Sequence, residues 1–309
     1  MTAGATTSVF GLTAALIWGA ADFSGGLAAK YIRVYWLLAI SHASSLAALL
    51  LLTVLMHQAR PDAHILAWGL LSGLAGGTAL LTFYYALSLG GMGVTAAFTG
   101  LLTAALPVVF TLATLGAPSH RQLAGFVLAA GAIWLISSQP GENAEATGDK
   151  RKKLALAMVA GLGFGVFLIA LQQANGGGLL WPLAASRVGS LALALGGGLI
   201  FSRGRFTVKT KEEPLSPRVE NPGSGRWKNN QAIWKVGILL TLISSTCDTG
   251  GNFFFVAATR VGRLDVAAML SSLYPASTIL LAAWLLKERT SPRQALGMAA
   301  ALVAVALIS

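Results

Sequence analysis

Ten apolar stretches, each long enough to cross a lipid bilayer, occupy almost the whole chain. An α-helix rises about 1.5 Å per residue, so crossing about 30 Å of hydrocarbon takes roughly 20 apolar residues. The expected spans of the first half are Val9–Ala29, Val34–Met56, Ile65–Leu89, Val94–Leu115 and Gln122–Ser138. Those of the second half are Leu154–Gln173, Leu179–Phe201, Ile233–Ala258, Leu264–Leu286 and Arg293–Ser309. The sequence therefore predicts an all-α membrane protein with ten transmembrane helices.

The composition favours a membrane protein and disfavours an enzyme. Hydrophobic residues make up 55% of the chain and charged residues 11%, where a soluble domain usually carries about 25% charged residues. The chain has no His/Cys metal-ligand spacing and no nucleophile motif, so we expect no cofactor and no enzymatic activity. An intramembrane enzyme remains an alternative, and Asp22 with Asp248 are its only candidate pair of acids.

The last five spans repeat the pattern of the first five. Trp18-Gly19 corresponds to Phe164-Gly165, and Pro107 in the fourth span corresponds to Pro275 in the ninth. Because five is an odd number, the two copies must cross the membrane in opposite senses. Inverted repeats of this kind are typical of secondary transporters, whose binding site lies near the bilayer midplane. The alternative is a duplication that produced a stable bundle without a transport role.

The repeat defines the expected domains. The first five-helix repeat is residues 1–140, a basic linker is 141–153, and the second repeat is 154–309. Within the second repeat, loop 202–231 is rich in Pro, Gly, Ser and Lys, and we expect it to be disordered.

Several motifs in these spans resemble the EamA branch of the drug/metabolite transporter superfamily. They are Trp18–Gly26, Leu180–Arg187, Cys247–Asn252, Ser271–Pro275 and Leu286–Arg289. The last of them is similar to the family's Gly-Glu-Arg segment, with Lys287 at the position of the glycine. The resemblance covers essentially the whole chain. It implies a ten-helix metabolite carrier, slightly favours export, and names no substrate.

The basic residues predict the orientation, since Lys and Arg accumulate in cytoplasmic loops. Seventeen of them fall on one side of the expected bundle and four on the other. The seventeen are Lys30, Arg33, Lys150–Lys153, Arg203, Arg205, Lys209, Lys211, Arg218, Arg226, Lys228, Lys235, Lys287, Arg289 and Arg293. The four are Arg60, Arg121, Arg260 and Arg263. Both termini are therefore expected outside, although better-known carriers of the superfamily have both inside. We expect the basic loops to contact anionic lipid head groups rather than nucleic acid.

Three charged residues lie well inside the expected spans, where a charge costs about 2.5–3.5 kcal/mol on insertion scales. Asp248 is a candidate proton carrier or counter-charge for a cationic substrate, and Asn252 lies one turn away on the same helix face. Arg187 could bind a substrate carboxylate, or it could form a structural ion pair with Asp248. Asp22 is a further candidate for the pathway. Alternatively, Ser24 and Lys30 satisfy its charge near the membrane interface, and it has no functional role.

Trp18, Tyr274 and Gln172 complete the expected substrate or ion pathway, and His42 is considered beside it. Trp18 lies mid-span, as a cavity wall or a packing residue, and Tyr274 precedes a proline that can free a backbone carbonyl. Gln172 lies near the end of the sixth span, as part of an outer gate or a cap. His42 is a hydrogen-bonded core histidine or a proton relay. We expect one central cavity to be lined by five of these residues, Tyr274, Asn252, Asp22, Arg187 and Asp248.

We therefore expect a secondary active transporter that moves small polar metabolites or drugs by alternating access. Export across a bacterial cytoplasmic membrane is preferred, with protons as the candidate coupling ion. A flippase for a lipid-linked group is the main alternative, and a channel is another. A flippase would need a lateral opening to lipid, whereas a carrier of soluble metabolites would need a closed cavity.

Overall fold

The computed structural model describes residues 3–32, 34–88, 92–137, 150–176, 178–203, 227–287 and 289–309. These residues form α-helices and one short 3₁₀ turn, without a strand among them. The helices of the first half are α1 (Ala3–Ala28), α2 (Val34–Leu55), α3 (Ala63–Ser88), α4 (Met92–Leu115) and α5 (His120–Ser137). Those of the second half are α6 (Lys150–Gln173), α7 (Leu180–Arg203), α8 (Trp227–Val261), α9 (Leu264–Ser271), α10 (Tyr274–Leu285) and α11 (Pro292–Ile308).

The helix bounds agree closely with the expected spans, with two notable differences. Helix α1 begins at Ala3 and α8 at Trp227, each six residues before the expected start. Residues 227–231 are therefore helical, so the prediction that loop 202–231 is disordered was wrong for these five residues. The remaining part of that loop, 204–226, lies outside the described residues, as do 138–149 of the linker region.

Six segments of the described chain are long and apolar enough to cross a membrane. They come from α1, α2, α3, α4, α6 and the α9–α10 pair. Helix α8 is not among them, because the polar stretch Ser244–Asn252 lowers its hydropathy. Large apolar side chains such as Val127, Leu302 and Trp284 are about three-quarters exposed on the outside of the bundle. An apolar exterior of this kind suits a lipid environment rather than water.

The ninth expected span is broken into two helices. Helix α9 ends at Ser271, and α10 begins at Tyr274 with Pro275 in its first turn. Proline lacks the N–H that would continue the hydrogen-bond ladder, and its ring clashes with the carbonyl four residues earlier. The sequence position of Pro275 thus produces a discontinuous span. Helix α4, in contrast, runs unbroken through Pro107.

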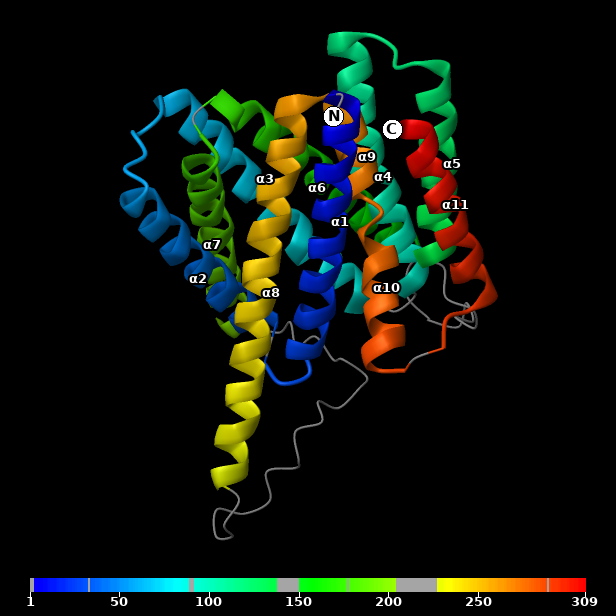
Figure 1. Ribbon diagram of the computed structural model, residues 1–309. Coiled ribbons are helices and arrows are strands. Elements are labelled where there is room, and N and C mark those ends of the chain that lie inside the picture. Colours follow the sequence, from blue (N-terminus) through cyan, green and yellow to red (C-terminus); the bar gives the residue numbers. More distant parts are fainter. Residues whose placement is uncertain are drawn as a thin grey trace.

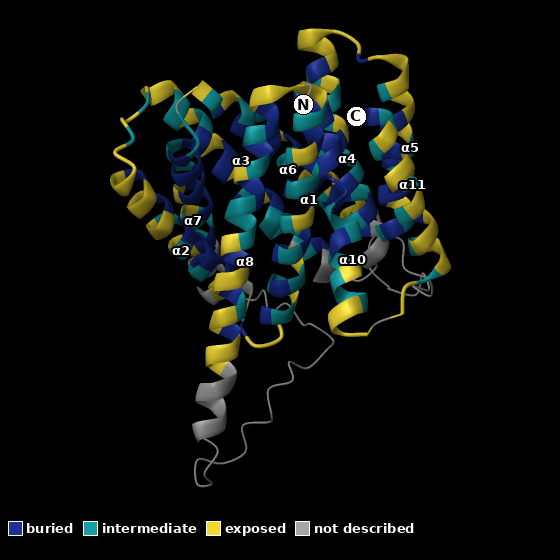
Figure 2. Ribbon diagram, viewed as in Figure 1, coloured by how far each residue is buried: buried dark blue, intermediate teal, exposed yellow. Residues whose placement is uncertain are grey.

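The helices pack as one bundle with both chain ends at the same end of it (Figure 1). Helix α1 packs on α8 and on the α9–α10 pair, α3 packs on α6 and α7, and α4 packs on α6. Helix α2 packs on α7, and α5 packs on α11. Buried positions face inward and exposed positions face outward along most helices (Figure 2).

We call the end of the bundle that carries Ala3 and Ile308 the terminus face, and the opposite end the basic face (Figure 1). The basic face carries the C-terminal end of α1 and the N-terminal ends of α6 and α8. Lys30 follows the end of α1, Arg151 and Lys152 lie in the first turn of α6, and Lys235 lies in the N-terminal part of α8. The described part of the chain thus has the one-sided charge distribution expected from the sequence.

Candidate functional site: a charged cluster between α1, α2, α7 and α8

Helices α1 and α8 run antiparallel in a register that places their polar residues opposite each other. The indole Nε1–H of Trp18 donates a hydrogen bond to Asn252 Oδ1 at 3.2 Å. Ser244 Oγ donates to the carbonyl of Ala21 at 2.9 Å, closer to the basic face. Glycine permits this close approach, because a Cβ on Gly251 would lie 2.2 Å from Trp18 Cδ1. Asp22 and Asp248, one turn toward the basic face from Trp18 and Asn252, are close enough to interact electrostatically.

Arg187 of α7 and Asp248 of α8 form an ion pair inside the bundle. Arg187 Nη2 lies 2.6 Å from Asp248 Oδ2 and donates to Thr249 Oγ1 at 3.3 Å. Arg187 Nη1 lies 3.5 Å from His42 Nδ1. A guanidinium can only donate, so a hydrogen bond across this contact requires Nδ1 of His42 to accept. The Arg187 Nε–H is buried and has no hydrogen-bond partner in the described part of the chain.

A network of hydroxyl groups joins α2 to α8 beside this ion pair. Ser245 Oγ donates to the carbonyl of Ser41 at 2.7 Å and lies 2.6 Å from Ser45 Oγ and 2.9 Å from Ser44 Oγ. Thr249 Oγ1 lies 2.8 Å from Ser45 Oγ, and it also receives the Arg187 hydrogen bond. The network therefore fixes Thr249, and through it the guanidinium of Arg187.

We infer from its exposure that Asp248 faces an open space inside the bundle, here called the hollow. On α8 it shares one face with the buried residues Thr241, Asn252 and Phe255, and the lipid-exposed residues lie on the opposite face. Even so, 37% of the Asp248 side chain is exposed, compared with 4% for its partner Arg187. Exposure on the packed face of a helix requires open space between the helices.

Asp22 has the same combination of properties. It lies on the face of α1 that carries the buried residues Ser8, Gly11 and Ala15, yet the residue is exposed. No hydrogen bond or ion pair of Asp22 is present among the described residues. We infer that the two carboxylates share the hollow, and that Arg187 lies behind Asp248.

Aromatic side chains adjoin this hollow on the side of the terminus face. Phe255 stacks on Trp18 with ring centroids 5.8 Å apart, and Tyr274 meets Trp18 edge-on at 6.5 Å. Trp18 and Tyr274 are half-buried, whereas Phe255 is fully buried. The hydrogen bond to Asn252 fixes the orientation of the Trp18 indole within this group.

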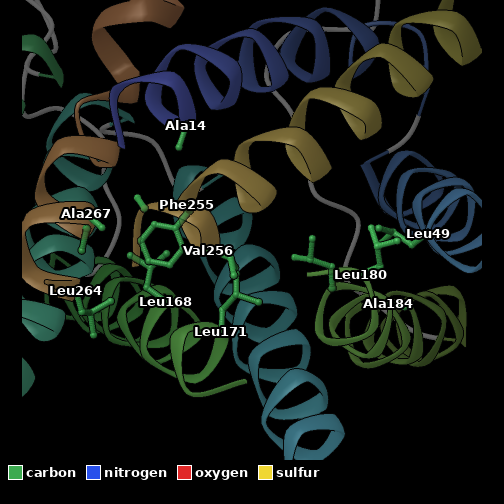
Figure 3. Close-up of a cluster of buried hydrophobic side chains, with 13 residues drawn as sticks. Ala14, Leu49, Leu168, Leu171, Leu180, Ala184, Phe255, Val256, Leu264 and Ala267 are labelled. Carbon is green, nitrogen blue, oxygen red and sulfur yellow. The ribbon is translucent and has the colours of Figure 1, made fainter. Parts of the chain in front are cut away.

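A dry apolar layer separates the hollow from the terminus face. Phe255 of α8 faces Leu168 of α6, with Leu264 and Ala267 of α9 beside them (Figure 3). These four residues and Ala14 of α1 are at most 4% exposed. Close packing of this layer opposes the entry of water from the terminus face.

Polar contacts close the terminus face above this layer. The Arg260 guanidinium donates to the side chain and to the carbonyl of Asn175, and Asn175 donates to Thr259 Oγ1 at 3.2 Å. Arg263 Nη2 binds Asp265 Oδ2 at 2.8 Å and the carbonyl of Gly116 at 2.9 Å. Hydrogen bonding to Asp265 raises the pKa of the Arg263 guanidinium.

The structure brings most of the expected pathway residues together. Asp248 contacts Arg187, Asn252 contacts Trp18, and Trp18 contacts Tyr274, while Asp22 lies near Asp248. Gln172 lies near the C-terminal end of α6, and in the described part of the chain no hydrogen bond or ion pair joins it to this cluster.

Two sets of polar residues were not anticipated from the sequence. One is the hydroxyl network on α2, for which the run Ser41-His42-Ala43-Ser44-Ser45 inside an apolar span was the available signal. The other is Asp265, which is fully buried against Arg263 at the start of α9. The described residues contain no group of three or more His, Cys, Asp or Glu side chains that could hold a metal ion.

A helical bundle with an apolar exterior and charged residues in its interior defines a multi-pass membrane protein with an internal polar site. Comparisons with known proteins agree with this class. Residues 214–309 match the model of the EamA-like transporter family, which belongs to the drug/metabolite transporter superfamily. This match confirms the resemblance drawn from the sequence, and the family implies a membrane transporter of the drug/metabolite type.

The fold itself has a solved counterpart. A protein crystal structure superposes with a TM-score of 0.69 at 16% sequence identity, over 99% of this chain and 96% of that chain. At this identity the likeness shows a common fold and nothing of function. No curated protein sequence matches the chain.

Proposed function

We propose that this protein is a secondary active transporter that carries small polar metabolites or drugs by alternating access to the hollow between α1, α2, α7 and α8. The observation that carries the proposal is the exposure of Asp22 and Asp248 on the packed faces of their helices. Charges inside a membrane persist where water, a counter-charge or a substrate satisfies them. A hollow that offers water and two carboxylates, closed toward one face by a dry layer, suits a carrier.

We further propose that the ten spans form two inverted five-helix repeats, with α9 and α10 together as the ninth span. The packing supports this arrangement, because exchanging each span with its counterpart five spans later reproduces the pattern. The α1–α8 contact corresponds to α6–α3, and the α4–α6 contact corresponds to that of the α9–α10 pair with α1. The pairs α2–α7 and α5–α11 each join a span to its own counterpart.

In this proposal the structure represents the state that is open toward the basic face. The apolar layer around Phe255 and the contacts of Arg260 and Arg263 would separate when the hollow opens to the terminus face. The basic face is assigned to the cytoplasm by the positive-inside rule, so both termini lie outside. The membrane is taken to be a bacterial cytoplasmic membrane, and export is the preferred direction.

Protons are the proposed coupling ion. The titratable and charged groups around the hollow are Asp22 on α1, His42 on α2, Arg187 on α7 and Asp248 on α8. Carboxylates that share a hollow can exchange a proton for substrate, since loss of their charge removes the electrostatic attraction.

The test is a substrate screen on vesicles that contain the purified protein and an internal pH-sensitive dye. Asp248→Asn should abolish proton-coupled uptake while the protein remains folded in the membrane, because the change keeps the shape and removes the charge. Asp22→Asn should do the same. Asp62→Asn, a matched change in the exposed loop before α3, should leave uptake intact.

Normal proton-coupled uptake by Asp248→Asn would overturn the mechanism. The same vesicles, loaded with a fluorescent lipid, separate the rival function. Flipping of that lipid without uptake of any soluble compound would establish a flippase in place of a metabolite carrier.

A further inference from the structure

The charges around the hollow are unequal in number and in access. Two carboxylates, Asp22 and Asp248, face the open space, and one cation, Arg187, lies behind Asp248 at 4% exposure. His42 contributes no anionic group, and its Nδ1 lies 3.5 Å from Arg187 Nη1. With both carboxylates ionised and His42 neutral, the hollow presents a net negative charge to anything that enters it.

The two carboxylates differ in their partners. Asp248 is neutralised by Arg187 at 2.6 Å, whereas Asp22 has no hydrogen bond or ion pair among the described residues. An anionic ligand would meet both carboxylates before it could reach the buried Nε–H of Arg187. A cationic ligand would instead supply the counter-charge that Asp22 lacks.

Aromatic residues stand next to that unpaired charge. Trp18 lies four residues before Asp22, on the same face of α1, and Tyr274 packs against the indole edge-on. The hydrogen bond to Asn252 and the stacking on Phe255 hold the indole in place before any ligand arrives. A carboxylate beside electron-rich rings is the chemistry that recognises alkylammonium groups.

We propose that the hollow binds small organic cations, with Asp22 as the direct partner of an alkylammonium group and Trp18 and Tyr274 as its aromatic wall. Asp248 is already neutralised by Arg187, so the charge that attracts the cation is that of Asp22. This inference rests on the proposed function, since it names the substrate class of the proposed carrier.

The inference is tested by equilibrium binding to the full-length protein in a nonionic maltoside detergent. The probes share one skeleton and differ in charge: 2-phenylethylammonium, 2-phenylethanol and phenylacetate. Calorimetry should show saturable binding of the ammonium compound, binding of the alcohol that is at least about tenfold weaker, and no binding of phenylacetate. Tighter binding of phenylacetate, equal binding of all three probes, or no binding of the ammonium compound would each overturn the proposal.

Substitutions then locate the site. Asp22→Asn should weaken binding of 2-phenylethylammonium by about 10- to 100-fold, the usual effect of losing a hydrogen bond to a charged group. Asp22→Glu keeps the charge and should keep most of the affinity, and Asp62→Asn should bind as the unchanged protein does. The thermal melting of each variant is recorded, so that a misfolded Asp22→Asn protein is not taken for a binding defect. Undiminished binding by folded Asp22→Asn would overturn the assignment.

An ammonium group can belong to a soluble amine or to a lipid head group. The titration is therefore repeated with added phosphatidylethanolamine and with added phosphatidylglycerol. Competition by phosphatidylethanolamine alone assigns the site to the lipid amine, and its absence assigns the site to soluble amines. If vesicles take up only neutral or anionic compounds, the carrier stands and the ammonium site is overturned.

Discussion

Arg187 is almost completely buried, while Asp248, whose carboxylate lies 2.6 Å from the guanidinium, has a side chain that is 37% exposed. The pair is thus one-sided, with the cation embedded among α2, α7 and α8 and the anion in contact with the hollow. Removing Asp248 and removing Arg187 should therefore have different consequences, because water can hydrate the Asp248 carboxylate in its present position but not the Arg187 guanidinium.

Truncating the anion should be costly for the fold. Asp248→Ala leaves the Arg187 guanidinium buried without a counter-charge, and we expect a loss of about 3–5 kcal/mol in unfolding free energy. The double variant Arg187→Met with Asp248→Leu replaces the pair by apolar side chains and should lose clearly less than the single variant. The measurement is reversible unfolding in detergent–denaturant mixtures. A double variant as unstable as Asp248→Ala alone would contradict this account.

The Trp18–Asn252 hydrogen bond should contribute to stability beyond the packing of the indole. Trp18→Phe removes the donor and leaves Asn252 Oδ1 without this hydrogen bond. Because Asn252 is only 2% exposed, we expect the unfolding free energy to fall by about 1–3 kcal/mol. Trp284→Phe is the matched control, because Trp284 is 76% exposed. The unfolding free energy of this variant should change by no more than about 0.5 kcal/mol. Equal melting temperatures of the two variants would show that the hydrogen bond contributes nothing.

The contact of α3 with α7 depends on glycine at its closest point. A Cβ on Gly73 would lie 1.9 Å from the carbonyl oxygen of Ser186, so Gly73→Ala must push the two helices apart. A Cβ on Gly131 of α5 would meet nothing within 4 Å, and Gly131→Ala should be neutral or slightly stabilising. The yield of monodisperse protein and its melting temperature should fall for Gly73→Ala only. A fall of the same size for Gly131→Ala would rule out the packing explanation.

The end of α2 stores strain that a glycine should relieve. His57 has φ +50° and closes the helix, with Gln58 N–H donating to the carbonyl of Thr53 and His57 N–H donating to that of Val54. This arrangement is a Schellman motif, in which glycine is usual at the position of His57. His57→Gly should raise the unfolding free energy by about 1 kcal/mol. His57→Ala keeps the left-handed conformation without relief and should not stabilise, so a gain with alanine would refute the strain argument.

The hollow can be detected by its water. In a Cys247→Ala background, Asp22→Cys and Asp248→Cys should react with a charged, membrane-impermeant thiol reagent, because thiolate chemistry requires water. Leu239→Cys lies on the lipid-exposed face of α8, where Leu239 is 59% exposed, and it should not react in membranes. Reactivity is measured by mass shift. Protection of both inward-facing cysteines would mean that the helix faces are dry.

The apolar stretches and the cost of charges within them were sufficient to predict an all-helical membrane protein and to single out Asp22, Arg187 and Asp248. Helix periodicity and hydrophobic length are local properties, so they can be recognised in a single sequence. The same reasoning marked Pro275 as exceptional, although the division of its span into α9 and α10 came from the structure.

The tertiary structure decided which polar groups meet and which of them water reaches. Asp248 is adjacent in sequence to Thr249 but forms its ion pair with Arg187, 61 residues earlier, and Trp18 bonds Asn252 across 234 positions. Such contacts depend on the register of packed helices, which is fixed by glycines and small side chains at close approaches. The sequence by itself thus determined which polar residues are available to form the site. The exposure of Asp22 and Asp248 and the burial of Arg187 arose only from the way the helices pack.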